Sequence, residues 1–229
     1  MRALGADVGH GEEVAARIAV AVLAEAMQDA AFLAGLQRDK RKKIQQERRR
    51  VAEAGITFEI LEGEAITAAH WDFFYRCYTL TYQAHHSTPY LTRDFFARMA
   101  ATMARHWVLF LARRGGEPLA CSLIGIDPER RVAYGRYWGA VEHVPCLHFE
   151  ACYYQPLQWC IAQGYLRFEG GAQGEHKMAR GLLPVPTHSA HWLAHPQFAR
   201  AVADFLEREG DGVEHYLDEL NERSPFKAA

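Results

Sequence analysis

The sequence predicts a mixed α/β (α+β) protein, and three observations support this class. Segments in which apolar and polar residues alternate, as in half-buried strands, lie between segments with apolar residues at helical spacing. Strand-like segments joined by short Gly- or Pro-containing turns predict an antiparallel meander in the middle of the chain. A length of 229 residues, of which 49% are hydrophobic, is enough for one substantial domain with its own core.

Composition excludes several classes of protein. The 5 cysteines are odd in number and contain no C-x-x-C pair, which argues against a disulfide framework and against a zinc knuckle. No stretch approaches the roughly 20 uninterrupted apolar residues that span a bilayer. The apolar run from Ala15 to Ala24 contains Arg17 and follows Glu12 and Glu13, unlike a signal sequence. We therefore expect a cytoplasmic protein without a membrane span.

The N-terminal segment, residues 1–54, is predicted to be helical and to precede a main domain of residues 55–229. Val14, Ile18 and Val22 recur at four-residue spacing among many alanines, which predicts a helix over residues 12–34. This helix is expected to continue into the basic segment that follows.

The basic segment, residues 38–50, contains eight Lys or Arg residues against Asp39 and Glu47. Such a run is typical of a solvated helix face, but it also suits an element that contacts phosphates. We keep both interpretations open.

The first part of the main domain reads as one strand and two helices. Ile56, Phe58 and Ile60 alternate with polar residues, as in a strand that follows the Gly55 stop. Thr67 is a predicted N-cap, and Thr92 is another. The first helix carries an aromatic stripe that is expected to be core: Trp71, Phe74, Tyr75, Tyr78 and Tyr82.

Three strands follow in close succession, at 107–113, 118–126 and 132–138. A helix at 148–163 is expected to end at Gly164, in the left-handed conformation, and Pro156 is expected to kink or interrupt it. A short strand at 166–169 comes next.

The remainder is predicted to be a loop with one helical turn (170–181), an extended segment (184–194) and a helix from Pro196. That helix should bury Phe198, Val202, Phe205 and Leu206, and Gly210 and Gly212 should interrupt it. The whole order is typical of the GNAT-type N-acyltransferase fold, in which helices flank a mixed, splayed central sheet that opens a cleft.

Four segments carry the most specific residue patterns: 135–139 (GRYWG), 147–155 (LHFEACYYQ), 170–177 (GGAQGEHK) and 187–192 (THSAHW). Together they resemble the Fem-type (FemAB-like) branch of the GNAT superfamily, which is associated with peptidoglycan biosynthesis or recognition. The resemblance implies a longer protein with two acyltransferase-like halves, of which this chain supplies the C-terminal one. A missing half would bare an apolar surface, so we expect self-association into a homo-oligomer.

The resemblance implies an N-acyl or aminoacyl transferase that acts on an amino group, such as that of a cell-wall precursor. Aminoacyl-tRNA, contacted through residues 38–50, and acyl-CoA are the candidate donors, and no other cofactor is expected. The Arg/Gln-x-x-Gly-x-Gly/Ala loop that holds the pyrophosphate of coenzyme A in ordinary GNAT enzymes is absent after the third meander strand. A non-catalytic binding module that keeps the cleft is the alternative.

Acyl transfer to an amine needs a proton acceptor and donors for the developing oxyanion. The candidate catalytic residues are His148, Glu150, Glu175 and His176. The candidate substrate-binding residues are Arg136, Tyr137, Tyr153, Gly171, Gln173, Gly174, Lys177, Arg180 and His188. The glycines allow close approach of backbone to a ligand, and we expect their segment to converge on the same cleft as Arg136 and His148.

Two pairs of histidines are candidate metal ligands. His143 and His148, or His188 and His191, are close in sequence, but strand residues three apart face opposite sides. No metal site is predicted.

Overall fold

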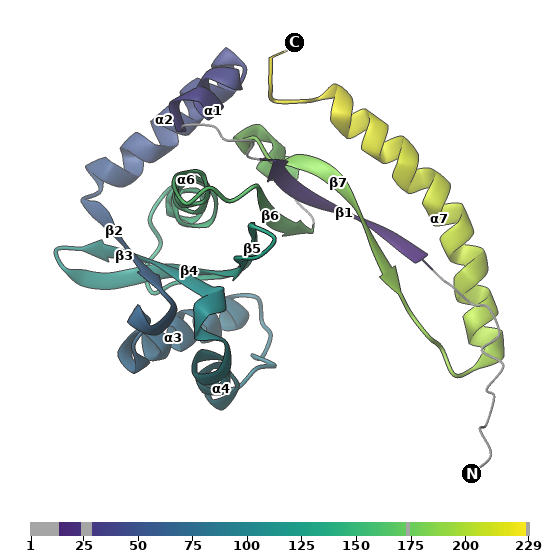
Figure 1. The fold of residues 1–229 in the computed structure, drawn as a ribbon, viewed down its shortest axis with the longest axis horizontal. Helices are drawn as coiled ribbons and strands as arrows, with labels where there is room; N and C mark the ends of the chain where they lie inside the picture. The colour runs from purple at the N-terminus through teal and green to yellow at the C-terminus, as the bar shows by residue number, and fades with distance from the viewer. Residues whose placement is uncertain (1–13, 24–28, 173–174, 228–229) are drawn as a thin grey trace. The chain divides into compact units, whose positions relative to one another are not determined.

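The computed structural model describes residues 14–23, 29–172 and 175–227. The chain divides into two compact units. The larger comprises residues 20–183 and 224–229, and the smaller comprises residues 1–19 and 184–223. Figure 1 labels the helices and strands of both units.

The larger unit is built on a mixed sheet. Its strands, in spatial order, are β2 (Ile56–Glu62), β3 (Trp107–Arg114), β4 (Glu117–Asp127), β5 (Val132–Ala140) and β6 (Arg167–Ala172). Neighbours from β2 to β5 pair antiparallel, as the predicted meander requires, and β5 pairs parallel with β6. The mixed sheet of the predicted fold class is therefore confirmed.

The sheet splays between β5 and β6. Their parallel pairing runs only from Val132 opposite Arg167 to Tyr134 opposite Glu169, although β5 continues to Ala140. Beyond Tyr134 the two strands therefore leave room between them.

Two helices cover one face of this sheet, α3 (Ala68–Ala84) and α4 (Arg93–Met103), and Thr67 and Thr92 cap them as predicted. The aromatic stripe of α3 packs with α4, β3 and β4 in one core, in which Trp71, Phe74 and Tyr78 are buried. A Cβ on Gly139 would lie 2.4 Å from the carbonyl oxygen of Cys77. The glycine thus lets the backbone of α3 lie directly on β5.

The other face carries α1 (Asp29–Gly35), α2 (Arg38–Glu53) and one helical segment made of α5 (Leu147–Phe149), the π-helical turn η3 (Glu150–Tyr154) and α6 (Gln155–Ala162). Figure 1 shows α6 and α3 on opposite faces of the sheet. Pro156 lies in the first turn of α6, directly after the π-helical turn, where its missing N–H costs little. Gly164 has φ of 70°, which confirms the left-handed stop.

Short 3-10 turns complete the larger unit: η1 (Gly63–Ala65), η2 (Ala104–His106) and η4 (Glu175–Arg180). The last of these corresponds to the helical turn predicted within residues 170–181.

The smaller unit holds most of β1 (Val14–Leu23) and β7 (Leu183–Ala190), together with α7 (Pro196–Glu222). The prediction of a helix over residues 12–34 is wrong for β1, and the helix begins only at Asp29. A spacing of four is also a multiple of two, so Val14, Ile18 and Val22 share a strand face as well as a helix face.

Helix α7 differs from its prediction in two respects. Gly210 and Gly212 lie within one continuous helix, because a helical glycine costs only about 1 kcal/mol each and does not break the hydrogen-bond ladder. Phe198 and Phe205, which were expected to be buried, are 60% and 54% exposed. Helical spacing predicts which residues share a face, but not whether another element covers it. No helix among the described residues has the length and apolarity to cross a membrane.

Candidate active site

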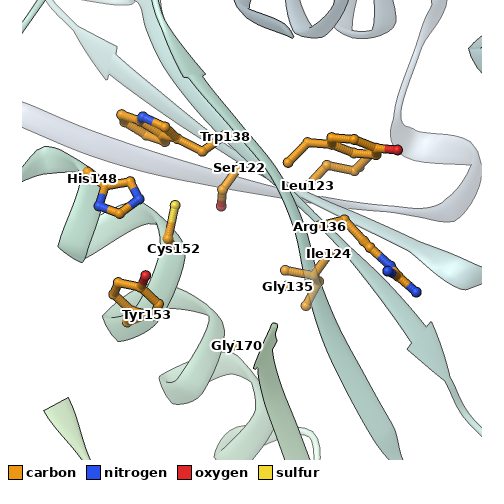
Figure 2. Close-up of a pocket in the computed structure, with 11 residues that line it drawn as sticks. Ser122, Leu123, Ile124, Gly135, Arg136, Trp138, His148, Cys152, Tyr153 and Gly170 are labelled. Carbon is orange, nitrogen blue, oxygen red and sulfur yellow. The ribbon is translucent and has the colours of Figure 1, made fainter. Parts of the chain in front are cut away.

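A cavity of about 130 Å³ lies where β5 and β6 stop pairing, between the sheet and the helical segment that begins at Leu147. Figure 2 shows Trp138, Ser122, His148, Cys152 and Tyr153 grouped on one side of β5, whereas the side chain of Arg136 extends away from His148. The lining residues are Ser122, Leu123, Ile124, Gly135, Arg136, Tyr137, Trp138, His148, Cys152, Tyr153 and Gly170. The structure thus brings His148 and Tyr153 to the part of β5 that holds Arg136 and Tyr137, although the Tyr137 ring itself packs against Phe74 and Tyr78 on the α3 face.

A β-bulge at Arg136 changes the alternation of side chains along β5. Leu123 pairs with Tyr137 and Ile124 pairs with Gly135, so Arg136 has no partner on β4. A bulge of this kind interrupts the alternation of side chains and re-aims them. A Cβ on Gly135 would lie 3.3 Å from the carbonyl oxygen of Glu169, so a small residue also suits the point where β5 meets β6.

His148 lies between two aromatic rings. Its imidazole centroid is 5.4 Å from that of Trp138 and 5.6 Å from that of Tyr153, in edge-to-face geometry. Burial, and then the charges of His176, Arg180 and Lys177, lower the pKa of His148 to about 4. The imidazole is therefore neutral at pH 7 and can accept a proton, and an anion bound beside it would raise its pKa.

His176 extends this group. The Tyr153 hydroxyl lies 3.4 Å from Nε2 of His176, which links η4 to the π-helical turn. Burial, and then Arg180 and Lys177, lower the pKa of His176. Burial raises the pKa of Tyr153, so its phenol stays protonated and can donate a hydrogen bond. We call His148, Tyr153 and His176 the cavity-side cluster.

Lys177 and Arg180 are buried and hold backbone groups. Nζ of Lys177 donates to the carbonyl oxygens of Gly170, at 2.7 Å, and Gly171, at 3.2 Å. Arg180 donates to the carbonyl oxygen of His176, and its guanidinium stacks 3.5 Å from the ring centroid of Phe149. Both cations position the glycine-rich segment.

A second group of charges forms around α2. Arg180 pairs with Glu47 at 2.8 Å, and the Tyr154 hydroxyl donates to the same carboxylate. Glu150 accepts from Nε of Arg48 at 3.2 Å and from Nε2 of Gln155 at 2.7 Å. We call Glu47, Arg48, Glu150 and Arg180 the ion-pair cluster.

Glu150 is thus separated from the cavity. It lines a different hollow, together with Arg48 and Gln155 from α2 and α6. Its two-residue offset from His148 already indicated that they do not share a helix face, and the structure places them on different sides of the segment.

Some predicted site residues cannot be placed. Gln173 and Gly174 lie outside the described residues, and the side chains of Glu175 and His188 are likewise not described. Gly171 belongs to β6 and has φ of 80°, a conformation that favours glycine. No group of three or more metal-ligating side chains occurs in the described part of the chain.

The sequence analysis missed Ser122, Trp138 and Cys152 as lining residues. Cys152 follows His148 by four residues on a predicted helix, so the spacing could have indicated a shared face. Ser122 gave no such signal; its hydroxyl donates to the carbonyl oxygen of Ala151 at 2.5 Å, which fastens β4 to the π-helical turn.

The splayed mixed sheet, covered by helices on both faces, defines a Fem/GNAT-like α/β fold. Residues 22–228 match the FemAB-like family, which is described as peptidoglycan biosynthesis/recognition. The chain belongs to this family. No curated protein matches its sequence.

Three solved structures share the fold. The C-terminal domain of a putative lysylphosphatidylglycerol synthetase from Agrobacterium fabrum has 14% identity and a TM-score of 0.55 over 85% of this chain and 67% of that chain. L-PGS from Bacillus licheniformis has 11% identity and a TM-score of 0.58, with the same 85% and 67% coverage. FemX has 13% identity and a TM-score of 0.50, and the match covers 69% of this chain and 53% of the FemX chain.

Proposed function

We propose that this chain is an aminoacyl transferase of the Fem type, which moves an aminoacyl group from an activated carrier to an acceptor in peptidoglycan or lipid biosynthesis. The single observation that carries the proposal is the cavity at the β5–β6 splay, because it places a neutral, half-buried imidazole, that of His148, beside a protonated phenol. Family membership and the fold of the aminoacyl-lipid synthetases support the same reaction class.

The proposed reaction assigns a role to each cavity residue. The acceptor amine attacks the ester carbonyl of the donor, so that a C–N bond forms and the C–O bond to the carrier breaks. His148 accepts the proton that leaves the nitrogen, and this proton passes to the departing carrier hydroxyl. Tyr153 donates a hydrogen bond to the developing oxyanion, while Arg136 binds an anionic group of a substrate.

Aminoacyl-tRNA is the proposed donor. On α2, Ile44, Glu47 and Val51 face inward, whereas several cations of the same helix are exposed: Arg38, Lys42, Lys43, Arg49 and Arg50. A row of exposed cations on one helix suits the phosphates of a nucleic acid. The ion pair between Arg48 and Glu150 is partly buried, so Arg48 is assigned to the fold instead.

The test is a transfer assay with purified protein. Radiolabelled aminoacyl-tRNA and, separately, radiolabelled acetyl-CoA are offered as donors to a nucleotide-linked muropeptide precursor and to phosphatidylglycerol vesicles. An alkali-stable amide product identifies the amine acceptor, and an alkali-labile ester identifies the lipid hydroxyl.

His148→Ala should reduce the transfer rate by about 10²- to 10⁴-fold, the range for loss of a general base. His215→Ala, at an exposed position of α7, is the matched control and should keep the wild-type rate. Wild-type turnover by His148→Ala would refute the assignment. Donor and acceptor binding without any transfer would instead identify a non-catalytic binding module.

A further inference from the structure

A second cavity, of about 430 Å³, lies on the α3 face of β5. Helix α3 supplies Tyr78 and Tyr82, the connection to α4 supplies Tyr90, and β5 supplies Arg136, Tyr137 and Trp138. We call it the tyrosine pocket. Nothing in the proposed catalytic roles uses its tyrosines.

The rings of the tyrosine pocket form a connected array. Ring centroids are 4.8 Å apart for Tyr78 and Tyr82, 5.8 Å for Tyr82 and Tyr90, and 5.4 Å for Tyr78 and Tyr137. Tyr78 is buried, whereas Tyr90 is 69% exposed, so the array runs from the core to the surface. The outer members of the array, Tyr82 and Tyr90, offer ring surface and hydroxyl groups to a flat ligand.

The hydroxyls of Tyr82 and Tyr137 remain protonated. Burial, and then hydrogen bonding with Tyr90, raise the pKa of Tyr137 to about 12. Burial, and then hydrogen bonding with Tyr78, raise the pKa of Tyr82. The phenols can therefore donate to ring nitrogens or carbonyl oxygens, which a hydrocarbon ligand lacks.

Arg136 determines the charge of the occupant. Among the residues that line the tyrosine pocket in the described part of the chain, Arg136 alone carries a permanent charge. No carboxylate from that part of the chain lines the pocket. The guanidinium of Arg136 lies 5.8 Å from the ring centroid of Tyr134, and within the described residues it has no ion pair. An aromatic pocket with a cationic edge disfavours an ammonium ligand, which Arg136 would repel, and favours a ring that carries an anion.

We propose that the tyrosine pocket binds a nucleotide group, with the base against Tyr82 and Tyr90 and the phosphate on Arg136. A volume of about 430 Å³ is within the usual range for a small-molecule site. Aromatic side chains stack bases of any sequence, and a guanidinium pairs with phosphate in bidentate geometry.

The tyrosine pocket adjoins the catalytic cavity. Arg136, Tyr137 and Trp138 line both, and His148 lies 5.4 Å from Trp138 between ring centroids. The two cavities lie on opposite faces of β5, and a third hollow shares Thr81 and His85 with the tyrosine pocket and His148 with the catalytic cavity, which gives a group attached to the nucleotide a route past β5 to His148. The inference deepens the proposed function and rests on it, since either the carrier or the acceptor of an aminoacyl transfer can be nucleotide-linked.

The test measures binding of AMP, UDP, the trinucleotide CCA, adenosine and inorganic phosphate by calorimetry and ligand-observed NMR, with no turnover required. Arg136→Gln should weaken the binding of AMP and UDP by at least about tenfold and leave the affinity for adenosine unchanged. Tyr90→Ser should weaken the binding of nucleotides and of adenosine alike, by about tenfold, because the substitution removes a stacking surface. Tyr90 is exposed, so this variant is expected to fold.

Arg130→Gln, at a turn position where the side chain is 80% exposed, is the matched control and should bind like the wild type. Preference for CCA over UDP assigns the pocket to the carrier, and the reverse preference assigns it to a nucleotide-linked acceptor; either supports the proposal. The proposal is overturned if no nucleotide binds, or if Arg136→Gln and Tyr90→Ser both bind nucleotides normally.

The two proposals fail in different ways. Nucleotide binding that these variants weaken, together with no transfer in any donor and acceptor combination, removes the proposed function and keeps the pocket. Transfer that depends on His148 but is unaffected by Arg136→Gln and Tyr90→Ser removes the pocket and the assigned role of Arg136, and keeps the aminoacyl transfer and the role of His148.

Discussion

The cavity-side cluster and the ion-pair cluster flank the same helical segment, residues 147–162, but they differ in how their charges are compensated. In the ion-pair cluster, Glu47 and Glu150 each accept from a guanidinium, and both carboxylates are buried. In the cavity-side cluster, His148 is partly buried beside other cationic groups and stays neutral. A compensated buried pair is costly to break, whereas a neutral imidazole against a cavity retains its capacity for proton transfer.

The π-helical turn between Glu150 and Tyr154 separates the two clusters. It directs Tyr153 toward His176 and the neighbouring Tyr154 toward Glu47. A π-helical turn changes the angular step between successive side chains and frequently occurs at functional sites. The comparison predicts different consequences for substitutions in the two clusters.

Breaking the buried ion pair should have the largest effect on stability. Glu47→Ala leaves the charge of Arg180 buried without its carboxylate, which costs roughly 3–5 kcal/mol for a buried pair. Urea unfolding of Glu47→Ala measures this loss. Glu53→Ala, exposed on the same helix, is the control and should change stability by less than about 0.5 kcal/mol. A loss below about 1 kcal/mol in Glu47→Ala would show that the cluster is not what holds α2 to η4.

The pH dependence of stability should identify the cavity-side cluster. The pKa of His148 is about 4 in the folded protein, whereas an exposed histidine has an ordinary pKa of 6.5, so the unfolded chain binds more protons between these two pH values. Stability from this group is therefore fully present above pH 6.5 and falls as the pH drops toward 4, by up to about 3 kcal/mol. His148→Gln should flatten that part of the urea-midpoint profile. An unchanged profile would mean that the imidazole is not desolvated as the structure indicates.

Glu150→Gln should have the smallest effect. Gln can keep the contacts with Arg48 and Gln155, so we expect a loss of about 1 kcal/mol from weakening a charge-assisted hydrogen bond. Its transfer rate should remain within about threefold of the wild type, in contrast to His148→Ala. A rate that falls as far as in His148→Ala would return Glu150 to the catalytic group and undo the distinction between the clusters.

Local patterns predicted much of the larger unit. The Thr67 and Thr92 caps, the meander and the Gly164 stop depend on interactions within a few residues, so the sequence contains their causes. The segment at Val14–Leu23 was misread because four-residue spacing fits both a helix and a strand. Which of the two forms depends on the partner that covers the apolar face, and local sequence does not contain that partner.

The candidate site shows the same division. Sequence alone determined the family resemblance, the residue types in segments 135–139, 147–155 and 170–177, and most element boundaries, because these depend on side-chain chemistry and short-range periodicity. Only the tertiary structure decided that Arg136 and His148 share a cavity and that Glu150 pairs with Arg48 across 102 positions. The pKa of His148 was likewise beyond the sequence, because desolvation and neighbouring charges arise only when distant segments pack together.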